Sequence, residues 1–273
     1  MACYDIRPLQ LRMLKILLAF DKICVEHNLH YCVFAGTLLG AIRHKGFIPW
    51  DDDMDVGMPR PYYEEFIKHS KEWLPAPYEF ICAENDPNYP LPFGKIQDSS
   101  TTLIERKHLS YLGGIYVDVF PYDGVPTNML TRRMHYAAFE FYKQLLYLAY
   151  RNPYKHGHGP SSWIPLLVQK IFTRQEIQQR IRKILMKYDY NKCDYTADYT
   201  DGLRGVMQKP VYDTYARHPF EEEMIQIPKL YDKYLRQIYG DYMKLPDKEH
   251  QRQHNFYYID LNKPYKEFKY KEE

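Results

Sequence analysis

The chain has 273 residues, 45% hydrophobic and 26% charged, a composition that suits one large globular domain or two closely packed ones. The formal net charge is only +2, so bulk binding of a polyanion such as nucleic acid is not expected. The five cysteines are widely spaced and form no CxxC motif, which argues against a zinc ribbon. Their pattern favours buried thiols in a reducing compartment.

The start of the chain and its hydropathy predict a cytoplasmic protein. Arg7, Arg12 and Lys15 interrupt the first apolar residues, so we expect no signal peptide. No run approaches the roughly 20 apolar residues that a membrane span needs. The 28 tyrosines suit grooves that hold sugars or nucleotides, and they suit surfaces near a membrane interface equally well.

The first elements are predicted to be a helix, a strand and a tight turn. Residues 9–27 carry apolar side chains at helical spacing and predict an amphipathic helix against the core. The apolar residues 30–35 predict a buried strand. Gly36-Thr37 is then expected to turn the chain into a short helix over residues 38–44, with a helix N-terminus that can hold phosphate.

An acidic cluster at residues 51–55 follows a loop that Pro49-Trp50 closes. Met54, Val56 and Met58 alternate with the acidic positions, which is the period of a strand with one buried face. Asp53 and Asp55 should therefore point the same way, roughly 7 Å apart along the strand. Two carboxylates beside a Gly-Thr turn predict a site for a divalent metal and a phosphate.

Two other interpretations of the acidic run compete. A solvated loop is the commoner use of such a run, but the interleaved apolar residues argue against it. Asp51, Asp53 and Asp55 also fit the first ligand positions of an EF-hand. That loop requires Gly and Glu at later positions, where this chain has Val56 and Tyr62. The EF-hand interpretation therefore fails.

The next region is expected to alternate short helices and strands. Residues 61–73 predict a helix with Pro in its first turn. A strand over 78–83 and a proline-rich loop over 86–92 follow. Residues 93–97 and 101–106 are expected to form a short antiparallel pair around Asp98-Ser-Ser.

Gly113-Gly114 precedes a predicted strand over residues 115–120, in which Asp118 lies on the face opposite the β-branched residues. A buried Asp is unfavourable unless it is paired or binds metal. One interpretation is an Asp that hydrogen-bonds a neighbouring loop. The other, which we favour because of Asp53 and Asp55, is a third metal carboxylate.

The rest of the chain predicts helices, over residues 128–151, 163–172, 175–188 and 229–239. His250 and His254 have the spacing of two metal ligands on one helix, but no acidic or Cys partner is near in the sequence. The tail after Lys263 alternates Lys and Glu and is expected to be a solvated end.

The order strand, Gly-Thr turn, helix, DxD strand and later Asp-bearing strand resembles the nucleotidyltransferase superfamily. There a Gly-Ser-type turn holds donor phosphates, and carboxylates on adjacent strands hold magnesium. The longer strings GTLLGAIRHKGFIPWDDDMDVGMPR, FGKIQD and GGIYVDVFPYDGVP are similar to the LicD family of phosphocholine transferases, which includes the fukutin-related branch. The resemblance covers residues 10–126 closely and residues 234–254 more weakly.

The resemblance implies an α+β (mixed α/β) fold: a small nucleotidyltransferase-like mixed sheet with flanking helices, followed by a mainly helical C-terminal part. Residues 1–126 would form the catalytic core with its N-terminal helix. Residues 127–273 would form a helical part that binds the acceptor and packs on the core.

The resemblance also implies a reaction. Phosphocholine would move from CDP-choline, or a related group from another CDP-alcohol, to a sugar hydroxyl of a cell-surface glycan, with release of CMP. Teichoic acid, lipopolysaccharide and capsule are the candidate acceptors. A lipid-linked acceptor would bring the protein to the inner face of the cell membrane as a peripheral protein. The helix over residues 163–172 and the one before it are candidate contacts; the alternative is that they pack inside the domain.

The implied site takes Mg²⁺ or Mn²⁺. Asp53 and Asp55 would hold the ion, and Asp118 would complete the site or accept the hydroxyl proton. Gly36 and Thr37 would position phosphate oxygens.

Further residues are assigned supporting roles. Asp51 would support the acidic cluster. Arg43, Arg60 and Lys95 are candidate phosphate partners, or otherwise surface charges. The aromatic pair Trp50 and Tyr116 could form the walls of a quaternary ammonium site through cation–π contact, or could be core aromatics.

Two other functions stay open. The same site could transfer ribitol phosphate, glycerol phosphate or a nucleotide. The protein could also be a non-catalytic metal-binding scaffold in a glycan assembly complex, although an intact DxD together with Asp118 argues against it.

Overall fold

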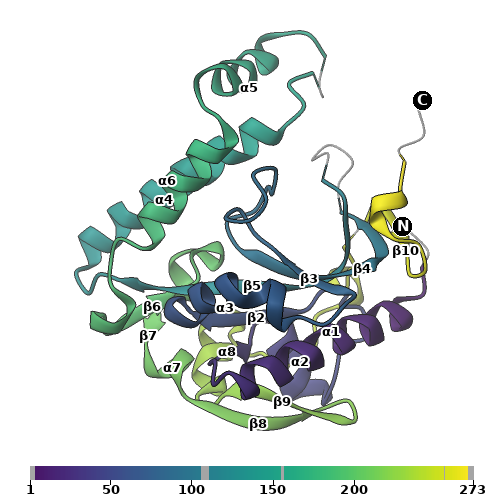
Figure 1. Ribbon diagram of the computed structural model, residues 1–273. Helices are drawn as coiled ribbons and strands as arrows, with labels where there is room; N and C mark the ends of the chain where they lie inside the picture. Colours follow the sequence, from purple (N-terminus) through teal and green to yellow (C-terminus); the bar gives the residue numbers. More distant parts are fainter. Residues whose placement is uncertain (1–3, 106–110, 155–156, 255, 270–273) are drawn as a thin grey trace.

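The centre of the computed structural model, which describes residues 4–105, 111–154, 157–254 and 256–269, is a mixed sheet (Figure 1). Its longest strand, β5 (Gly113–Val125), is buried along its whole length. β5 pairs in parallel with β2 (Asp55–Pro59) and antiparallel with β4 (Gly94–Ile104). The mixed α/β architecture expected from the sequence is confirmed.

Shorter strands complete this sheet. β1 (Cys32–Val33) pairs antiparallel with β2, and both β3 (Tyr78–Ile81) and β10 (Tyr258–Asp260) pair antiparallel with β4. β6 (Tyr195–Ala197) pairs with the far end of β5 and with β7 (Met207–Gln208). A separate hairpin consists of β8 (Tyr215–Phe220) and β9 (Glu223–Pro228).

The antiparallel pair predicted around Asp98-Ser-Ser is wrong, because one continuous strand, β4, runs through this segment. Its pairing with β5 shifts between Asp98 and Leu103, as at a β-bulge. Asp98 accepts hydrogen bonds from Ser100, and the Thr101 hydroxyl bonds back to the Asp98 carbonyl. The polar triplet thus stabilises a bulge rather than a turn. Residue 106 of the prediction lies outside the described residues.

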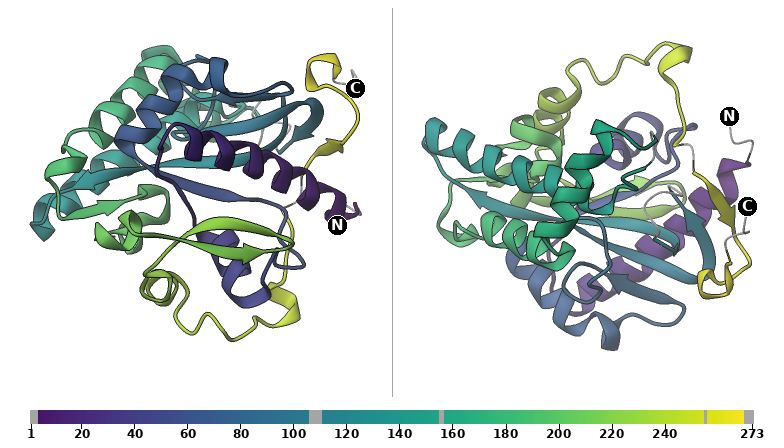
Figure 2. Two further views of the ribbon diagram at one scale, coloured as in Figure 1. Left: turned by 60° about the horizontal axis from the view of Figure 1, so that its bottom comes forward. Right: turned by 90° about the horizontal axis from the view of Figure 1, so that it is seen from above.

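Three helices lie close to the sheet. α1 (Ile6–Glu26), capped by Asp5, runs across one face of the sheet and buries Ile16, Leu17 and Phe20 (Figure 2). α2 (Ala35–His44) precedes β2, and α3 (Arg60–Trp73) follows it directly. α3 follows β2 without a gap, whereas residues 45–54, which include Asp51, Asp52 and Asp53, separate α2 from β2.

A helical arm projects from the sheet (Figure 1). α4 (Met129–Tyr150) and α6 (Arg174–Leu185) lie side by side, and α5 (Pro160–Ile171) packs on α4 toward the far end of the arm. Asn128 caps α4, and a Thr173–Glu176 capping box begins α6. The arm has its own apolar core, which Tyr199 and other residues after α6 complete.

The remaining helical segments are short. They are η2 (Tyr190–Lys192), η3 (Tyr199–Gly205), α7 (Pro210–Asp213), α8 (Tyr231–Tyr239), η4 (Lys248–His250) and η5 (Tyr265–Glu267). The main core includes residues from α7, α8, β8 and β9 as well as from the first half of the chain. Residues on both sides of position 126 thus share this core, and a division into two domains there stays a prediction.

The prediction of a solvated tail after Lys263 is wrong for Tyr265 and Phe268, which are half-buried, whereas Lys266 and Glu267 are exposed as expected. The Tyr265 hydroxyl donates to Glu79 at 2.5 Å, and the rings of Phe268 and Tyr258 lie 4.8 Å apart. The C-terminal segment therefore covers part of the sheet, and residues 270–273 lie outside the described chain. Within the described ranges, no helix combines the length and the apolar character needed to cross a membrane.

Candidate active site

Two adjacent parallel strands bring the predicted carboxylates together. In the pairing of β2 with β5, Asp55 lies directly opposite Asp118, and the Asp118 amide donates to the Met54 carbonyl at 2.9 Å. Met54, Val56 and Met58 are fully buried, so the predicted buried face of β2 is confirmed. Asp53 precedes Asp55 by two residues. The sheet therefore brings Asp118 to the pair Asp53 and Asp55, although Asp118 follows Asp55 by 63 residues along the chain.

The electrostatics of this acidic cluster oppose its full ionisation. Burial, followed by repulsion from Asp53 and Asp118, raises the pKa of the Asp55 carboxyl well above its usual range. Burial also raises the pKa of Asp118 to about 7. The pKa of Asp51 rises to about 8, through burial and then the charge of Asp53. Such a cluster favours protonation or a bound cation.

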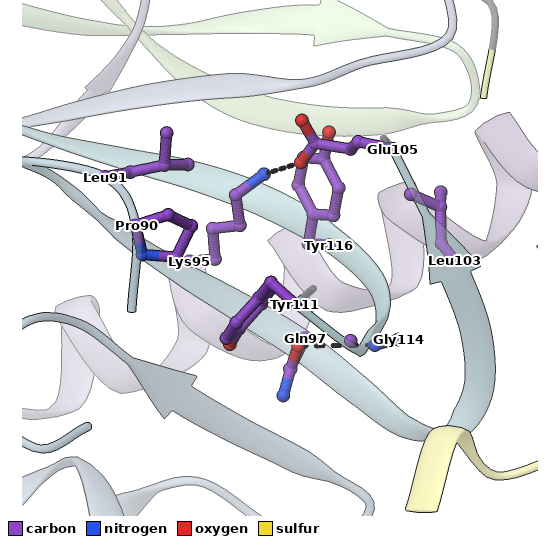
Figure 3. Close-up of a pocket in the computed structure, with 10 residues that line it drawn as sticks. Pro90, Leu91, Lys95, Gln97, Leu103, Glu105, Tyr111, Gly114 and Tyr116 are labelled. Carbon is purple, nitrogen blue, oxygen red and sulfur yellow. Dashed lines mark hydrogen bonds and ion pairs between the residues drawn. The ribbon is translucent and has the colours of Figure 1, made fainter. Parts of the chain in front are cut away.

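Lys95 on β4 is the register partner of Asp118 and is buried, so its interpretation as a surface charge is wrong. Its ammonium lies 3.2 Å from Asp118 Oδ1 and 2.5 Å from Glu105 Oε1. It also lies 3.1 Å from the centre of the Tyr116 ring, whose face it covers (Figure 3). The same face of Tyr116 cannot receive a quaternary ammonium while Lys95 is there.

Asp118 Oδ1 keeps an unused acceptor position. It is buried and has no hydrogen bond of acceptable geometry to the described residues, although the Lys95 ammonium is near. A buried carboxylate oxygen whose neighbour is only an ammonium, in a cluster of hard oxygen donors, fits a Mg²⁺ or Mn²⁺ ion. Within residues 4–105, 111–154, 157–254 and 256–269, however, no three Asp, Glu, His or Cys side chains converge as a finished metal site.

The Gly36-Thr37 pair lies inside the first turn of α2, which begins at Ala35, so the predicted helix start at Leu38 is wrong. Thr37 is buried, and its Oγ1 accepts a hydrogen bond from the Asp55 amide at 2.8 Å. A Cβ on Gly36 would lie 2.7 Å from Asp51 Oδ2, so glycine is required for the close approach of Asp51 to this helix.

Two of the predicted phosphate partners have structural contacts. Arg60 is buried and makes two hydrogen bonds to Asp123, of 2.7 and 2.6 Å, so it is neither a surface charge nor directed at the acidic cluster. Arg43 donates to the backbone carbonyl of Tyr242 at 2.9 Å. Trp50 is half-buried against the main core. The binding roles of Arg43 and Trp50 stay predictions.

His254 is a site residue that sequence reasoning missed. Its Nδ1 lies 2.7 Å from Asp52 Oδ1 and 3.8 Å from Asp53 Oδ2. The hydrogen bond to Asp52 raises the pKa of His254 to about 9, so the imidazole is positively charged at neutral pH. Asp52 is buried and also accepts a hydrogen bond from the Tyr4 hydroxyl.

The helical spacing of His250 and His254 has no structural meaning here, because η4 ends at His250. The other sequence signal for His254 was its place at the end of the weaker resemblance. Asp198 was missed as well. Burial raises its pKa to about 7, and its charge contributes to the raised pKa of Asp55.

Comparison with known proteins finds both a family model and a full-length relative that match the LicD family. A family sequence model described as "LicD/FKTN/FKRP, nucleotidyltransferase domain" matches residues 28–152. The lipopolysaccharide cholinephosphotransferase LicD of Haemophilus influenzae is 31% identical over 267 residues, which cover 92% of this chain and 96% of that protein. Uncharacterized proteins of Rickettsia typhi and Rickettsia prowazekii are 40% identical over 76 residues and 43% over 54, about a fifth of each chain.

Proposed function

Because the chain belongs to the LicD family, we propose that it is a transferase that moves phosphocholine, or a related phospho-alcohol, to a sugar hydroxyl of a cell-surface glycan. The similarity to a lipopolysaccharide cholinephosphotransferase over nearly the whole of both chains supports this choice. The structural observation that carries it is the pairing of Asp55 with Asp118 across β2 and β5, beside Asp53. This cluster suits chemistry on a charged diphosphate.

The proposed donor is CDP-choline. The hydroxyl oxygen of the acceptor forms a bond to the phosphorus of phosphocholine, the bond from that phosphorus to the CMP oxygen breaks, and CMP leaves with the electron pair. The hydroxyl proton passes to a carboxylate or to water. Lipopolysaccharide, teichoic acid and capsule are acceptors of suitable chemistry, and a lipid-linked acceptor would be modified at the inner face of the cell membrane.

Each residue of the acidic cluster has a proposed role. Asp53, Asp55 and Asp118 would hold Mg²⁺ or Mn²⁺, which when bound neutralises the donor diphosphate and the departing CMP. The Thr37 hydroxyl and the amides of the first turn of α2 would donate to a phosphate oxygen. His254, held positively charged by Asp52, lies on the same side of the cluster as Asp53 and would favour a bound anion.

Release of CMP from defined donors tests the proposal. The purified protein is incubated with magnesium, a truncated lipopolysaccharide acceptor and CDP-choline, CDP-ethanolamine, CDP-ribitol or CDP-glycerol. We expect CMP from CDP-choline, none with Asp55→Asn, and a normal rate with the matched control Asp194→Asn, whose side chain is exposed.

The outcomes separate the alternatives. Preference for CDP-ribitol or CDP-glycerol would reassign the transferred group while keeping the site. Magnesium binding without CMP from any donor, with several glycans offered, would support the scaffold function and contradict the transferase proposal.

A further inference from the structure

α5 exposes apolar side chains on its outer face. Its inner face packs on the arm through Ser162, Pro165 and Val168, which are buried at every third position. Trp163 and Leu167 on the opposite side are 67% and 58% exposed. Ile164, Leu166 and Ile171 are exposed as well. In a water-exposed helix the outer face is normally polar, so these residues indicate contact with an apolar partner.

The position of α5 makes this face accessible. The helix lies toward the far end of the arm, away from the central sheet (Figure 1). A flat partner could therefore reach Trp163 and Leu167 without meeting the body of the protein first. Tryptophan at such a place is typical of the boundary between lipid and water.

The charges around α5 favour an anionic partner. From Gly157 to Lys183 the chain carries five Lys and Arg residues and one acidic residue, Glu176, which is engaged in the capping box. Arg182 is paired with Glu64 and Glu84 and therefore adds little to the charge around α5. Lys170 is exposed, and it lies three residues after Leu167 and seven after Trp163, on the same helix face. Arg180 and Lys183 are exposed on α6 nearby. A second copy of this surface would be repelled by like charges.

We propose that the α5 face, defined as Trp163, Ile164, Leu167, Lys170 and Ile171, docks the protein on the surface of a bilayer that contains anionic phospholipid. The apolar side chains insert at the boundary between headgroups and acyl chains, and the basic residues approach the lipid phosphates. α5 lies in the interface plane and does not span the bilayer. Docking requires neither donor nor acceptor, so it is independent of the proposed reaction.

A mainly apolar cavity of about 410 Å³ lies between α4 of the arm and the segment over residues 90–93. Leu146, Tyr147 and Tyr150 of α4 line one side, and the segment that ends at Phe93 lines the other. The Phe93 ring stacks at 4.0 Å on Phe120 of β5. The arm that carries α5 thus borders a cavity whose opposite side contacts β5.

Sedimentation with vesicles tests the proposal on the full chain. Vesicles of phosphatidylcholine with about 30% phosphatidylglycerol are compared with vesicles of phosphatidylcholine alone. We expect the mixed vesicles to bind the wild type, and Leu167→Gln with Ile171→Gln to weaken binding by about fivefold or more. Val25→Gln with Met243→Gln, at exposed apolar positions elsewhere, is the matched control and should bind normally.

Tryptophan fluorescence gives a second readout. Trp163 is exposed, whereas Trp50 and Trp73 are half-buried, so vesicle addition should shift the emission of the wild type to shorter wavelength. Trp163→Phe should abolish that shift. Lys170→Glu with Arg180→Glu should remove the preference for anionic vesicles.

Several results would overturn the docking proposal. One is the absence of wild-type binding, and another is equal binding of the glutamine double variant while its melting temperature matches wild type. Equal binding to both vesicle types would remove the anionic lipid from the proposal. A dimer by light scattering that Leu167→Gln with Ile171→Gln dissociates would assign the face to a second copy of the chain.

Discussion

Asp118→Asn is the substitution that most directly separates a catalytic carboxylate from a structural one. Asn keeps the shape of Asp118 and one acceptor oxygen, but it removes the charge and replaces the other oxygen with an NH2 donor. In the metal-free protein that charge lies in a cluster with Asp53 and Asp55, next to Lys95. We expect the variant to melt at or above wild type in EDTA, to gain less from added magnesium, and to lose turnover by orders of magnitude.

The magnitude follows from the pKa of Asp118. Its rise to about 7 means that the folded state disfavours the carboxylate despite the ammonium of Lys95. A difference of about three units corresponds to roughly 4 kcal/mol at neutral pH, which is an upper limit for the gain. Lys95 loses one of two carboxylate contacts but keeps Glu105. We therefore expect Asp118→Asn to increase the free energy of unfolding of the metal-free protein by about 1–3 kcal/mol.

The assay is thermal unfolding at pH 7.5, in EDTA and with magnesium, together with Mn²⁺ binding and CMP release. Asp123→Asn provides a matched control, for which we expect the opposite change in the free energy of unfolding. It removes the carboxylate that accepts two hydrogen bonds from the buried guanidinium of Arg60 and leaves only the contact with Glu64 at 3.2 Å, which should cost about 3 kcal/mol with or without metal. Both substitutions remove one buried carboxylate charge from β5. A difference in their effects on the free energy of unfolding therefore reports the different neighbours of the two carboxylates.

Asp118 is a structural residue if Asp118→Asn melts well below wild type in EDTA, as expected for loss of a carboxylate anchored by hydrogen bonds, or if the variant still releases CMP at a normal rate. Either result would leave a two-carboxylate site. Loss of turnover with unchanged Mn²⁺ affinity would instead assign Asp118 to proton transfer.

Three further predictions concern metal, pH and His254. EDTA should abolish CMP release, and magnesium or manganese but not zinc should restore it, because the donors are hard oxygens; full turnover in EDTA would contradict the metal site. The pKa values of Asp51 (about 8) and Asp118 (about 7) are raised on folding, so their stabilising contribution is complete below about pH 4 and lost as pH rises through 7–8. The melting temperature in EDTA should therefore fall from pH 5 to pH 8, and this pH dependence should become weaker when magnesium is added. A melting temperature that rises over that range would contradict the raised pKa values of Asp51 and Asp118. His254→Gln should cost about 1–3 kcal/mol, measured by urea unfolding, because buried Asp52 loses a charged partner; an unchanged midpoint would show that the contact is dispensable.

Local patterns in the sequence were sufficient to predict most elements and part of the site. The alternation around Asp53 and Asp55 predicted the buried face of β2, and helical spacing predicted α1, α3, α4, α5 and α6 to within a few residues. These features depend on neighbours a few positions away, whose side-chain period is set by backbone geometry. The strings shared with the LicD family identified the family itself.

Long-range pairing was decided only by the tertiary structure. The register of β2 with β5 brings Asp55 opposite Asp118, and that of β4 with β5 places Lys95 beside Asp118. His254 reaches Asp52 across 202 residues of chain. Residue types and their spacing do not predict contacts between residues so far apart in the sequence, because strand register and the path of the chain depend on how the whole core packs. These contacts set the charge balance of the acidic cluster, so it could not be predicted from the acidic motif and is determined by the tertiary structure.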